Sequence, residues 1–398
     1  MRKKGVAFGK QVRTRKNNSF CLFLFFLVVY SITPLSCNTL RAQDSSRIEL
    51  RVETRQFFQD NEWFGLHAVG YTLPGFYLRP VVEWKMESEK WKVGLEGGVH
   101  WLHFWGARNY PSAQSLGVWQ QESDTSTTAH VLPWMRAEIE WKVGSGKWSV
   151  TMGDLHPHVL PLPLYNTERL YAADPEAGVQ LMLDHKHFNL DVWVDWQEYI
   201  WQRSSRQERF TAGVSGEMKA ESGKWKVRMP LHVIGQHVGG QGLKEHQRVQ
   251  NRFNAAVGLL GEWRAEIGMW NVEGGCYAMG FTQKNMPTIP YKRGWGLYPT
   301  VNGGWKAGNG TLTMDAGYWQ GHGFVPLLGS VLFSNLAYVD GITYFGMNRM
   351  MNIGAQYKWR VACGELRVEG RWYHYFEREN PSQYSVGVFI DMAPRVVF

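Results

Sequence analysis

Cysteine is scarce in this chain of 398 residues, which contains four: Cys21, Cys37, Cys276 and Cys363. Their spacing matches no zinc or iron–sulfur motif, so they indicate no metal centre. Cys21 and Cys37 lie in the first 42 residues, and no pattern indicates that Cys276 and Cys363 form a disulfide. The sequence also lacks a phosphate-binding glycine loop, a calcium loop and a nucleophile elbow. We therefore expect no metal and no cofactor.

Long apolar runs are missing as well. After residue 42 no segment approaches the about 18 consecutive apolar residues that a membrane-spanning helix requires. Any insertion into a bilayer must therefore use strands. No linker-like stretch follows residue 45, so we expect one domain over residues 43–398.

The first 42 residues differ from the rest. A basic segment ends at Ser19, and residues 20–35 are almost wholly apolar but too short to span a bilayer, which predicts a secretory signal peptide over residues 1–42. Cleavage after Ala42 fits the small-residue pattern, and lipidation at Cys37 is the alternative.

Net charge follows from this segment. The whole chain has 43 Lys and Arg against 35 Asp and Glu, and residues 1–42 hold the entire basic excess. The basic balance therefore does not indicate nucleic acid as a partner.

One short phrase recurs along the chain. Trp84 to Val93 and Trp141 to Val150 each join two alternating segments through a tight polar turn, with Trp and Lys at the segment ends. Indole rings favour the boundary between membrane and water, and Lys reaches the same level with its ammonium group. Hairpins closed in this way predict one rim of a transmembrane β-barrel. We expect an interface girdle of Trp84, Trp91, Trp141, Trp148, Trp225, Trp263, Trp270, Trp305 and Trp359.

Alternation of apolar and charged residues supports the same fold. Ile48, Leu50 and Val52 alternate with charged neighbours, and the pattern returns near the end of the chain. A wall between lipid and an aqueous lumen requires such alternation. The lumenal wall is predicted to carry Glu49, Arg51, Glu53, Arg55, Glu365, Arg367, Glu369 and Arg371.

The hairpin pattern predicts about 16 strands, with 14 to 18 acceptable. Their expected ranges are 47–56, 76–86, 91–105, 132–143, 148–154, 178–184, 189–201, 209–220, 225–238, 251–264, 269–281, 294–306, 311–320, 343–361, 365–376 and 384–398. Short turns alternate with longer connections, including 57–75, 106–131 and 155–177. In outer-membrane barrels the short turns face the periplasm and the long connections face outward.

The last strand ends in Phe398, which resembles the signal by which outer-membrane barrels are recognised by the barrel-assembly machinery. With the signal peptide and the hairpins, the chain resembles porin-like outer-membrane β-barrels of about 16 strands, though no family-specific motif matches. The resemblance implies an all-β closed antiparallel barrel in the outer membrane, in contact with its lipid. It also implies passive or selective diffusion of small hydrophilic solutes, without catalysis. Solute and oligomeric state stay open, a homo-oligomer included.

The connection 155–177 is the third long one, and in 16-stranded porins that loop commonly folds into the lumen. Its four prolines stiffen a stretch that also carries several apolar residues. We expect a pore constriction formed by Glu168, Arg169, Asp174 and Glu176, facing the lumenal arginines.

Two other function classes remain. A barrel enzyme, omptin-like or lipid-modifying, would use an Asp or Glu with His, as near Asp154, His156 and His158. A structural or adhesive barrel would present its aromatic outer connections, such as Trp319 to Tyr344, to a protein.

Overall fold

The computed structural model describes residues 46–64, 69–105, 129–200, 207–240, 248–264, 270–286, 289–337, 343–377 and 381–398. The expected signal peptide, its cleavage after Ala42 and the alternative lipidation at Cys37 lie outside these residues. So does most of the connection predicted at 106–131.

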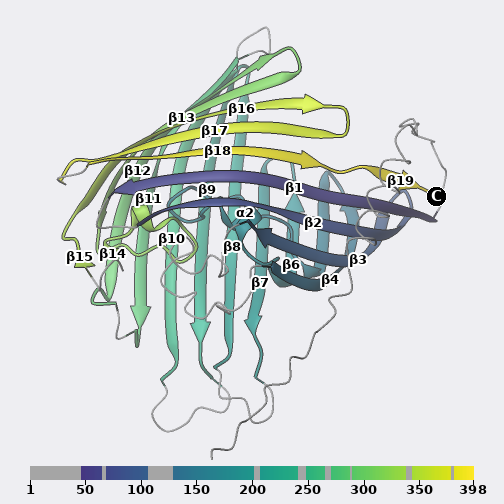
Figure 1. Ribbon diagram of the computed structural model, residues 1–398, viewed down its shortest axis with the longest axis horizontal. Helices are drawn as coiled ribbons and strands as arrows, with labels where there is room; N and C mark the ends of the chain where they lie inside the picture. Colours follow the sequence, from purple (N-terminus) through teal and green to yellow (C-terminus); the bar gives the residue numbers. More distant parts are fainter. Residues whose placement is uncertain are drawn as a thin grey trace, which may run out of the picture. The chain divides into compact units, whose positions relative to one another are not determined.

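Sixteen antiparallel strands form one closed barrel, as the sequence predicts (Figure 1). Each strand pairs with the next along the wall, and β1 closes the sheet by pairing with both β2 and β18. The strands are β1 (Ser46–Phe64), β2 (Val69–Glu87), β3 (Trp91–Phe104), β4 (Ala129–Val143), β5 (Gly146–Asp154), β6 (Ala177–Asp184), β7 (Phe188–Glu198), β8 (Arg209–Ser222), β9 (Trp225–Val238), β10 (Gln250–Arg264), β11 (Trp270–Lys284), β12 (Arg293–Ala307), β13 (Gly310–His322), β16 (Asn348–Val361), β17 (Gly364–Tyr375) and β18 (Ser382–Met392).

Three strand predictions need correction. The segment 57–75 is largely strand rather than a long connection, because the inward and outward alternation continues through Phe57, Gln59 and Asn61. The predicted strand 343–361 begins only at Asn348. Thr343–Tyr344 (β15) instead pairs with Leu336–Ala337 (β14) in a separate two-stranded sheet that is not part of the barrel wall. The last strand is interrupted before Arg395–Val397 (β19), where Pro394 has no N–H to donate.

Side-chain direction divides the wall into two faces. Along β10, Phe253, Val257 and Leu259 are exposed, whereas Asn254 and Leu260 are buried in the interior. The same alternation along the other strands covers the outside with Val, Leu, Ile, Met and aromatic side chains. A closed sheet with an apolar outside and a polar inside is the architecture of a barrel that spans a membrane with strands.

The tryptophans named above lie on the outward face beside the short turns. Register pairs Trp91 with Trp141, and Trp141 with Trp148, in one row across three strands. It also pairs Trp225 with Trp263, and Trp270 with Trp305. The rings of Trp270 and Trp305 stack with centroids 5.3 Å apart. Their assignment to a membrane interface stays a prediction.

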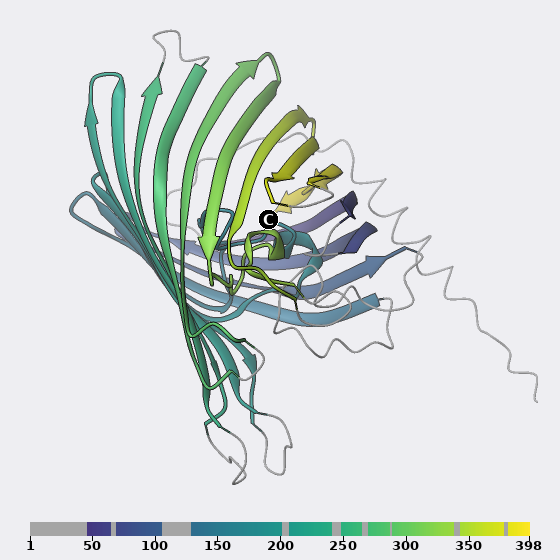
Figure 2. The same ribbon diagram turned by 90° about the vertical axis from the view of Figure 1, so that its left-hand side faces the viewer.

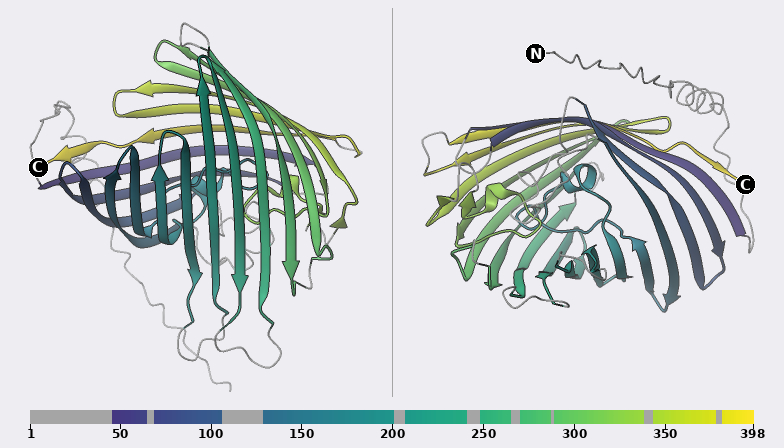
Figure 3. Two further views of the ribbon diagram at one scale, coloured as in Figure 1. Left: turned by 180° about the vertical axis from the view of Figure 1, so that it is seen from behind. Right: turned by 60° about the horizontal axis from the view of Figure 1, so that its bottom comes forward.

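Two connections fold back into the concave side of the wall, as Figures 2 and 3 show. One joins β5 to β6 and contains the single-turn helix α2 (Arg169–Ala172). The other follows β13 and contains the 3-10 turn η1 (Val331–Phe333). No helix among the described residues has the length and hydropathy needed to cross a bilayer.

Cys363 provides a test of orientation, because it is exposed in the short turn between β16 and β17. If short turns face the periplasm, a membrane-impermeant maleimide will label Cys363 only after the outer membrane is permeabilised. We expect Lys292→Cys, in the long connection between β11 and β12, to be labelled in intact cells. Both measurements use a Cys276→Ala background. Labelling of Cys363 in intact cells would show that the short turns face the outside of the cell, opposite to the prediction.

Candidate functional site

The two inward connections meet inside the barrel and form what we call the interior plug, residues 155–176 and 323–335. The backbone N–H of Asn166 donates to the carbonyl of Leu328 at 2.8 Å, and Tyr165 bridges Leu328 in parallel register. The plug is fastened to β10 because Asn254 accepts from the N–H of Leu327 at 2.7 Å and donates to the carbonyl of Val325 at 3.1 Å. Both connections are therefore held as one body against the wall.

An apolar core joins the plug to the wall. Phe324, Leu332 and Phe333 are at most 1% exposed and pack with Trp319 of β13. The Trp319 ring packs directly against Gly296, where an added Cβ would stand 2.1 Å from the ring. Wall residues in this core come from β1, β7, β9 to β13, β16 and β17. The interior at this level is filled by side chains, unlike the water-filled lumen of a wide porin.

Glu168, expected at a pore constriction, is only 6% exposed. Its carboxylate accepts from Asn61 Nδ2 at 2.8 Å on β1 and from the Tyr71 hydroxyl at 2.6 Å on β2. Burial in the plug raises the pKa of Glu168 to about 7, against the lowering effect of these hydrogen bonds. The residue therefore ties the plug to the wall instead of presenting a charge to open water.

His158 ties the plug to the opposite side of the interior. Its Nδ1 lies 2.7 Å from Asp191 Oδ2 of β7, its Nε2 lies 3.0 Å from Glu176, and its ring stacks on Trp193. Burial acts against protonation, yet hydrogen bonds to Asp191 and Glu176 raise the pKa of His158 to about 9. With both nitrogens occupied, this imidazolium is an anchor and not a free acid or base.

The other predicted constriction residues have different surroundings. Arg169 lies 3.3 Å from Glu176 within the plug, and Asp174 is exposed near its end. The carboxylates of Glu168 and Glu176 are thus held by Asn61, Tyr71, His158 and Arg169 rather than by the wall arginines.

The predicted wall residues lie on the inward face, and most form ion pairs within their own strand or with strands one or two places away along the wall. Arg51 reaches Glu53 at 2.8 Å and Glu83 at 2.6 Å, and also contacts Glu96. Arg55 contacts Asp391, Arg367 lies 3.2 Å from Glu369, and Arg371 lies 2.7 Å from Asp315. Glu365 lies 3.7 Å from Lys358. The side chain of Glu49 is buried, with 5% of its surface exposed. The arginines of the lumenal wall are therefore largely neutralised by carboxylates of the same wall.

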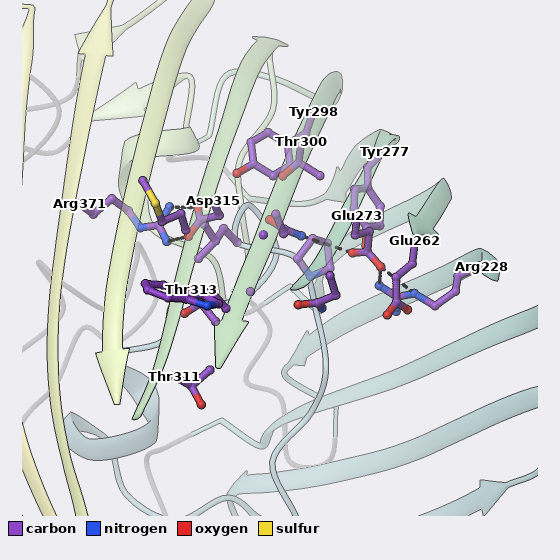
Figure 4. Close-up of a pocket in the computed structure, with 18 of the residues that line it drawn as sticks. Arg228, Glu262, Glu273, Tyr277, Tyr298, Thr300, Thr311, Thr313, Asp315 and Arg371 are labelled. Carbon is purple, nitrogen blue, oxygen red and sulfur yellow. Dashed lines mark hydrogen bonds and ion pairs between the residues drawn. The ribbon is translucent and has the colours of Figure 1, made fainter. Parts of the chain in front are cut away.

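A polar cavity of about 680 Å³ lies between residues 160–162 of the plug and the wall of β9 to β13 and β17 (Figure 4). Arg228 with Glu273 lies at one end and Arg371 with Asp315 at the other, and Tyr277 and Tyr298 complete the wall. Sequence alternation could have identified these residues as inward, but not as neighbours of one cavity.

The described part of the chain contains three serine–histidine hydrogen bonds, and none was predicted from the sequence. Ser215 and His232 lie inside the barrel at 2.9 Å, and Ser145 and His185 lie in the short turns at 2.7 Å. The third pair joins Ser382 Oγ of β18 to His374 Nδ1 of β17 at 3.2 Å.

The Ser382–His374 pair faces outward, at the ends of β17 and β18 that lie away from the short turns. The His374 ring stacks on Trp372, with centroids 5.3 Å apart, and meets the edge of Phe376 at 5.4 Å. These rings limit the rotation of the imidazole. The arrangement suits a nucleophile beside a base at a membrane surface. No group of three or more potential metal ligands occurs among the described residues.

A closed sixteen-stranded barrel with this exterior defines an outer-membrane β-barrel protein. The chain belongs to the lipid A 3'-O-deacylase-type family, whose model matches residues 40–398. No curated protein matches the sequence.

Several solved structures have a similar fold at low identity. OccK2 (OpdF) of Pseudomonas aeruginosa, solved with glucuronate, is 9% identical with a TM-score of 0.48, covering 89% of this chain and 100% of its own. OccAB4 of Acinetobacter baumannii is 8% identical with a TM-score of 0.49, covering 89% and 99%. OmpT of Vibrio cholerae is 11% identical with a TM-score of 0.46, covering 88% and 100%.

Glu168 predicts a pH-dependent stability. Its pKa rises from the ordinary 4.5 to about 7 on folding, so between these values the folded barrel holds a proton that the unfolded chain releases. Stability is therefore full below about pH 4.5 and falls as the pH rises to about 7, by about 3 kcal/mol. Urea unfolding in detergent micelles measures this.

Glu168→Gln is expected to remove that slope, and Glu221→Gln, at an exposed short turn, to keep it. Equal slopes in wild type and Glu168→Gln would contradict the assignment.

Proposed function

We propose that this barrel hydrolyses an ester-linked acyl chain of lipid A, with Ser382 as nucleophile and His374 as general base. The observation that carries the proposal is the exposed Ser382–His374 hydrogen bond on the outward surface of the barrel. Membership of the lipid A 3'-O-deacylase-type family supports the reaction class. The apolar plug also favours a function outside the lumen, because it leaves packed side chains where a diffusion channel needs water.

The reaction follows from these two side chains. His374 takes the proton of Ser382 as Oγ attacks the ester carbonyl, which forms a tetrahedral oxyanion. When that intermediate collapses, the bond from the acyl carbon to the sugar oxygen breaks, and His374 returns the proton to the sugar oxygen. Water, deprotonated by His374, then attacks the acyl-serine. The products are a free fatty acid, a sugar hydroxyl and the original serine.

The surroundings suit an amphipathic ester. Trp372, Phe376 and Tyr384 extend along the outward face beside the pair, and Phe376 is 53% and Tyr384 44% exposed. Aromatic rings of this kind are typical of the level where acyl chains meet headgroups. Glu62 of β1 pairs with Tyr384 in register and supplies a carboxylate to the same face. The ester that joins an acyl chain to the sugar headgroup would lie at the depth of these aromatic rings, beside Ser382.

The test is the mass of lipid A from cells that express the full chain. Wild type is expected to remove one ester-linked acyl chain, and Ser382→Ala to lower the rate by ~10³-fold or more, because the nucleophile and its base act as a unit. His374→Gln is expected to have a similar effect.

Ser215→Ala is the matched control, because it removes the serine of the interior pair. It is expected to keep wild-type acyl removal. Activity lost in Ser215→Ala and kept in Ser382→Ala would move the reaction inside the barrel. Unmodified lipid A in cells that contain folded wild-type barrel would reject deacylation.

A second candidate is the diffusion function expected from the sequence, and the polar cavity of about 680 Å³ favours it. Its paired charges and tyrosines would suit a small hydrophilic solute on a path blocked at one end by the plug.

Single-channel conductance in planar bilayers distinguishes the two candidates. For an acyl hydrolase with a packed interior, we expect wild type to show little conductance and deletion of residues 162–174 to open large steps, because the plug is removed. Stable large steps in wild type would favour diffusion. A folded deletion without conductance would mean that residues 323–335 seal the barrel alone.

A further inference from the structure

Basic side chains gather on the outward face of one sector of the barrel, at the rim away from the short turns. We call Lys284, Lys292, Arg293 and Arg349 the rim cations. They come from β11, from β12 and the connection before it, and from β16, which is separated from β12 only by β13 in the wall. All four side chains are exposed.

Strand register keeps the rim cations close together. Arg293 pairs with Thr282, two residues before Lys284, so these cations stand on neighbouring strands. The next pairs along the rim are Trp295 with His322 and Gln320 with Arg349. The carbonyl of Lys292 accepts from the N–H of Gln283 at 3.1 Å, which holds the connection against β11.

Among the residues that the structure describes, most of this charge has no acidic partner. Arg349 pairs with Glu377, but within the described part of the chain Lys284, Lys292 and Arg293 form no ion pair. Another part of the same rim has the opposite sign, since Asp60 and Glu62 lie on the outward face of β1. The excess of cations is therefore confined to one sector.

The composition of the strands below the rim cations indicates their depth. Arg293 is followed on the outward face by Trp295 and Leu297, each 42% exposed. Arg349 is likewise followed by Met351 and Ile353. Along β12 the order of cation, aromatic ring and aliphatic side chain matches headgroup, interface and hydrocarbon, and along β16 the cation is followed directly by aliphatic side chains.

We infer that the rim cations bind the phosphate groups of a phosphorylated glycolipid in the outer leaflet, with its acyl chains against the outside of β12 to β17. The sector borders the Ser382–His374 pair, because Arg349 of β16 lies one strand from His374 of β17. A lipid anchored by its phosphates would thus lie beside the nucleophile. This inference deepens the proposed function, from which it takes the identity of the lipid.

Binding of bis-phosphorylated lipid A to the full barrel in detergent micelles tests the inference. The Ser382→Ala background prevents turnover, and thermophoresis reports the affinity. We expect the triple variant Lys284→Gln, Lys292→Gln, Arg293→Gln to weaken binding by about tenfold or more at low salt. Added salt should reduce the wild-type affinity toward that of the variant.

The matched control removes three exposed cations from the short-turn rim, in Lys90→Gln, Arg264→Gln, Arg360→Gln. It is expected to bind as the background does. Dephosphorylated lipid A is expected to bind the background about as weakly as lipid A binds the triple rim variant. Equal losses in both triple variants, unchanged affinity in the rim variant, or tight binding of dephosphorylated lipid A would each overturn the inference.

The inference and the proposed function fail in different ways. If the proposed deacylation is wrong but the phosphate site is right, neither wild type nor any variant changes the mass of lipid A, and the rim variant still lowers the affinity for lipid A. Without the phosphate site, affinity is insensitive to the rim cations even if wild type removes an acyl chain.

Discussion

The closure of β1 onto β18 is the constraint on which the rest of the structure depends. In a bilayer each unpaired backbone N–H or C=O is costly, so a sheet can span it only when its two edges meet. β1 meets this condition over most of its length, with β2 on one side and β18 and β19 on the other. Closure also fixes the direction of every side chain, since a shift by one residue would turn each polar row toward lipid.

Closure of the barrel also determines how much interior space the chain must fill. A barrel of this width has more interior than its wall side chains can fill, and the chain fills part of it with the plug. Ordering those connections costs conformational entropy, which apolar burial and specific anchors offset. The anchors lie on both sides of the plug: Glu168 on β1 and β2, His158 on β7, and Asn254 of β10 holding the second connection. These buried polar side chains are tolerated because each anchor is hydrogen bonded.

The fold could be predicted from the sequence because alternation and turn chemistry are local. The periodicity of Ile48 to Arg55 and the tight turn at Gly144 to Lys147 identify strands without knowledge of their neighbours. β1 extended further than expected because its end carries outward polar residues, Asp60 and Glu62, which obscured the pattern. The prolines and leucines of residues 155–177 indicate locally that this connection folds inward. No local pattern indicates which residues are the partners of Glu168. Asn61 and Tyr71 are about a hundred residues away in sequence.

The same distinction explains why the outward site was missed. Ser382 and His374 are eight residues apart, yet they become neighbours only through the register of β17 and β18. The rim cations likewise become one group only when four strands lie side by side. Charge in the sequence points to the lumen, because charged residues that alternate with apolar ones are predicted to face inward. Charges on the lumenal wall are mostly paired with one another, however, and such pairs offer a ligand little net attraction.

Access distinguishes the three serine–histidine pairs as sites for a lipid. His232 is 5% exposed inside the barrel, and Ser215 Oγ also lies 3.4 Å from the carbonyl of Val159 in the plug. An acyl chain would have to leave the bilayer and cross a packed wall to reach them. Ser145 and His185 belong to the short turns, at the rim opposite the rim cations. Ser382 and His374 alone among these pairs combine an exposed position on the outward face, restraint of the imidazole by aromatic rings, and a neighbouring positive sector. A phosphorylated, acylated substrate would need no conformational opening of the barrel to meet them, so the rigidity that closure imposes is compatible with chemistry on the outer surface.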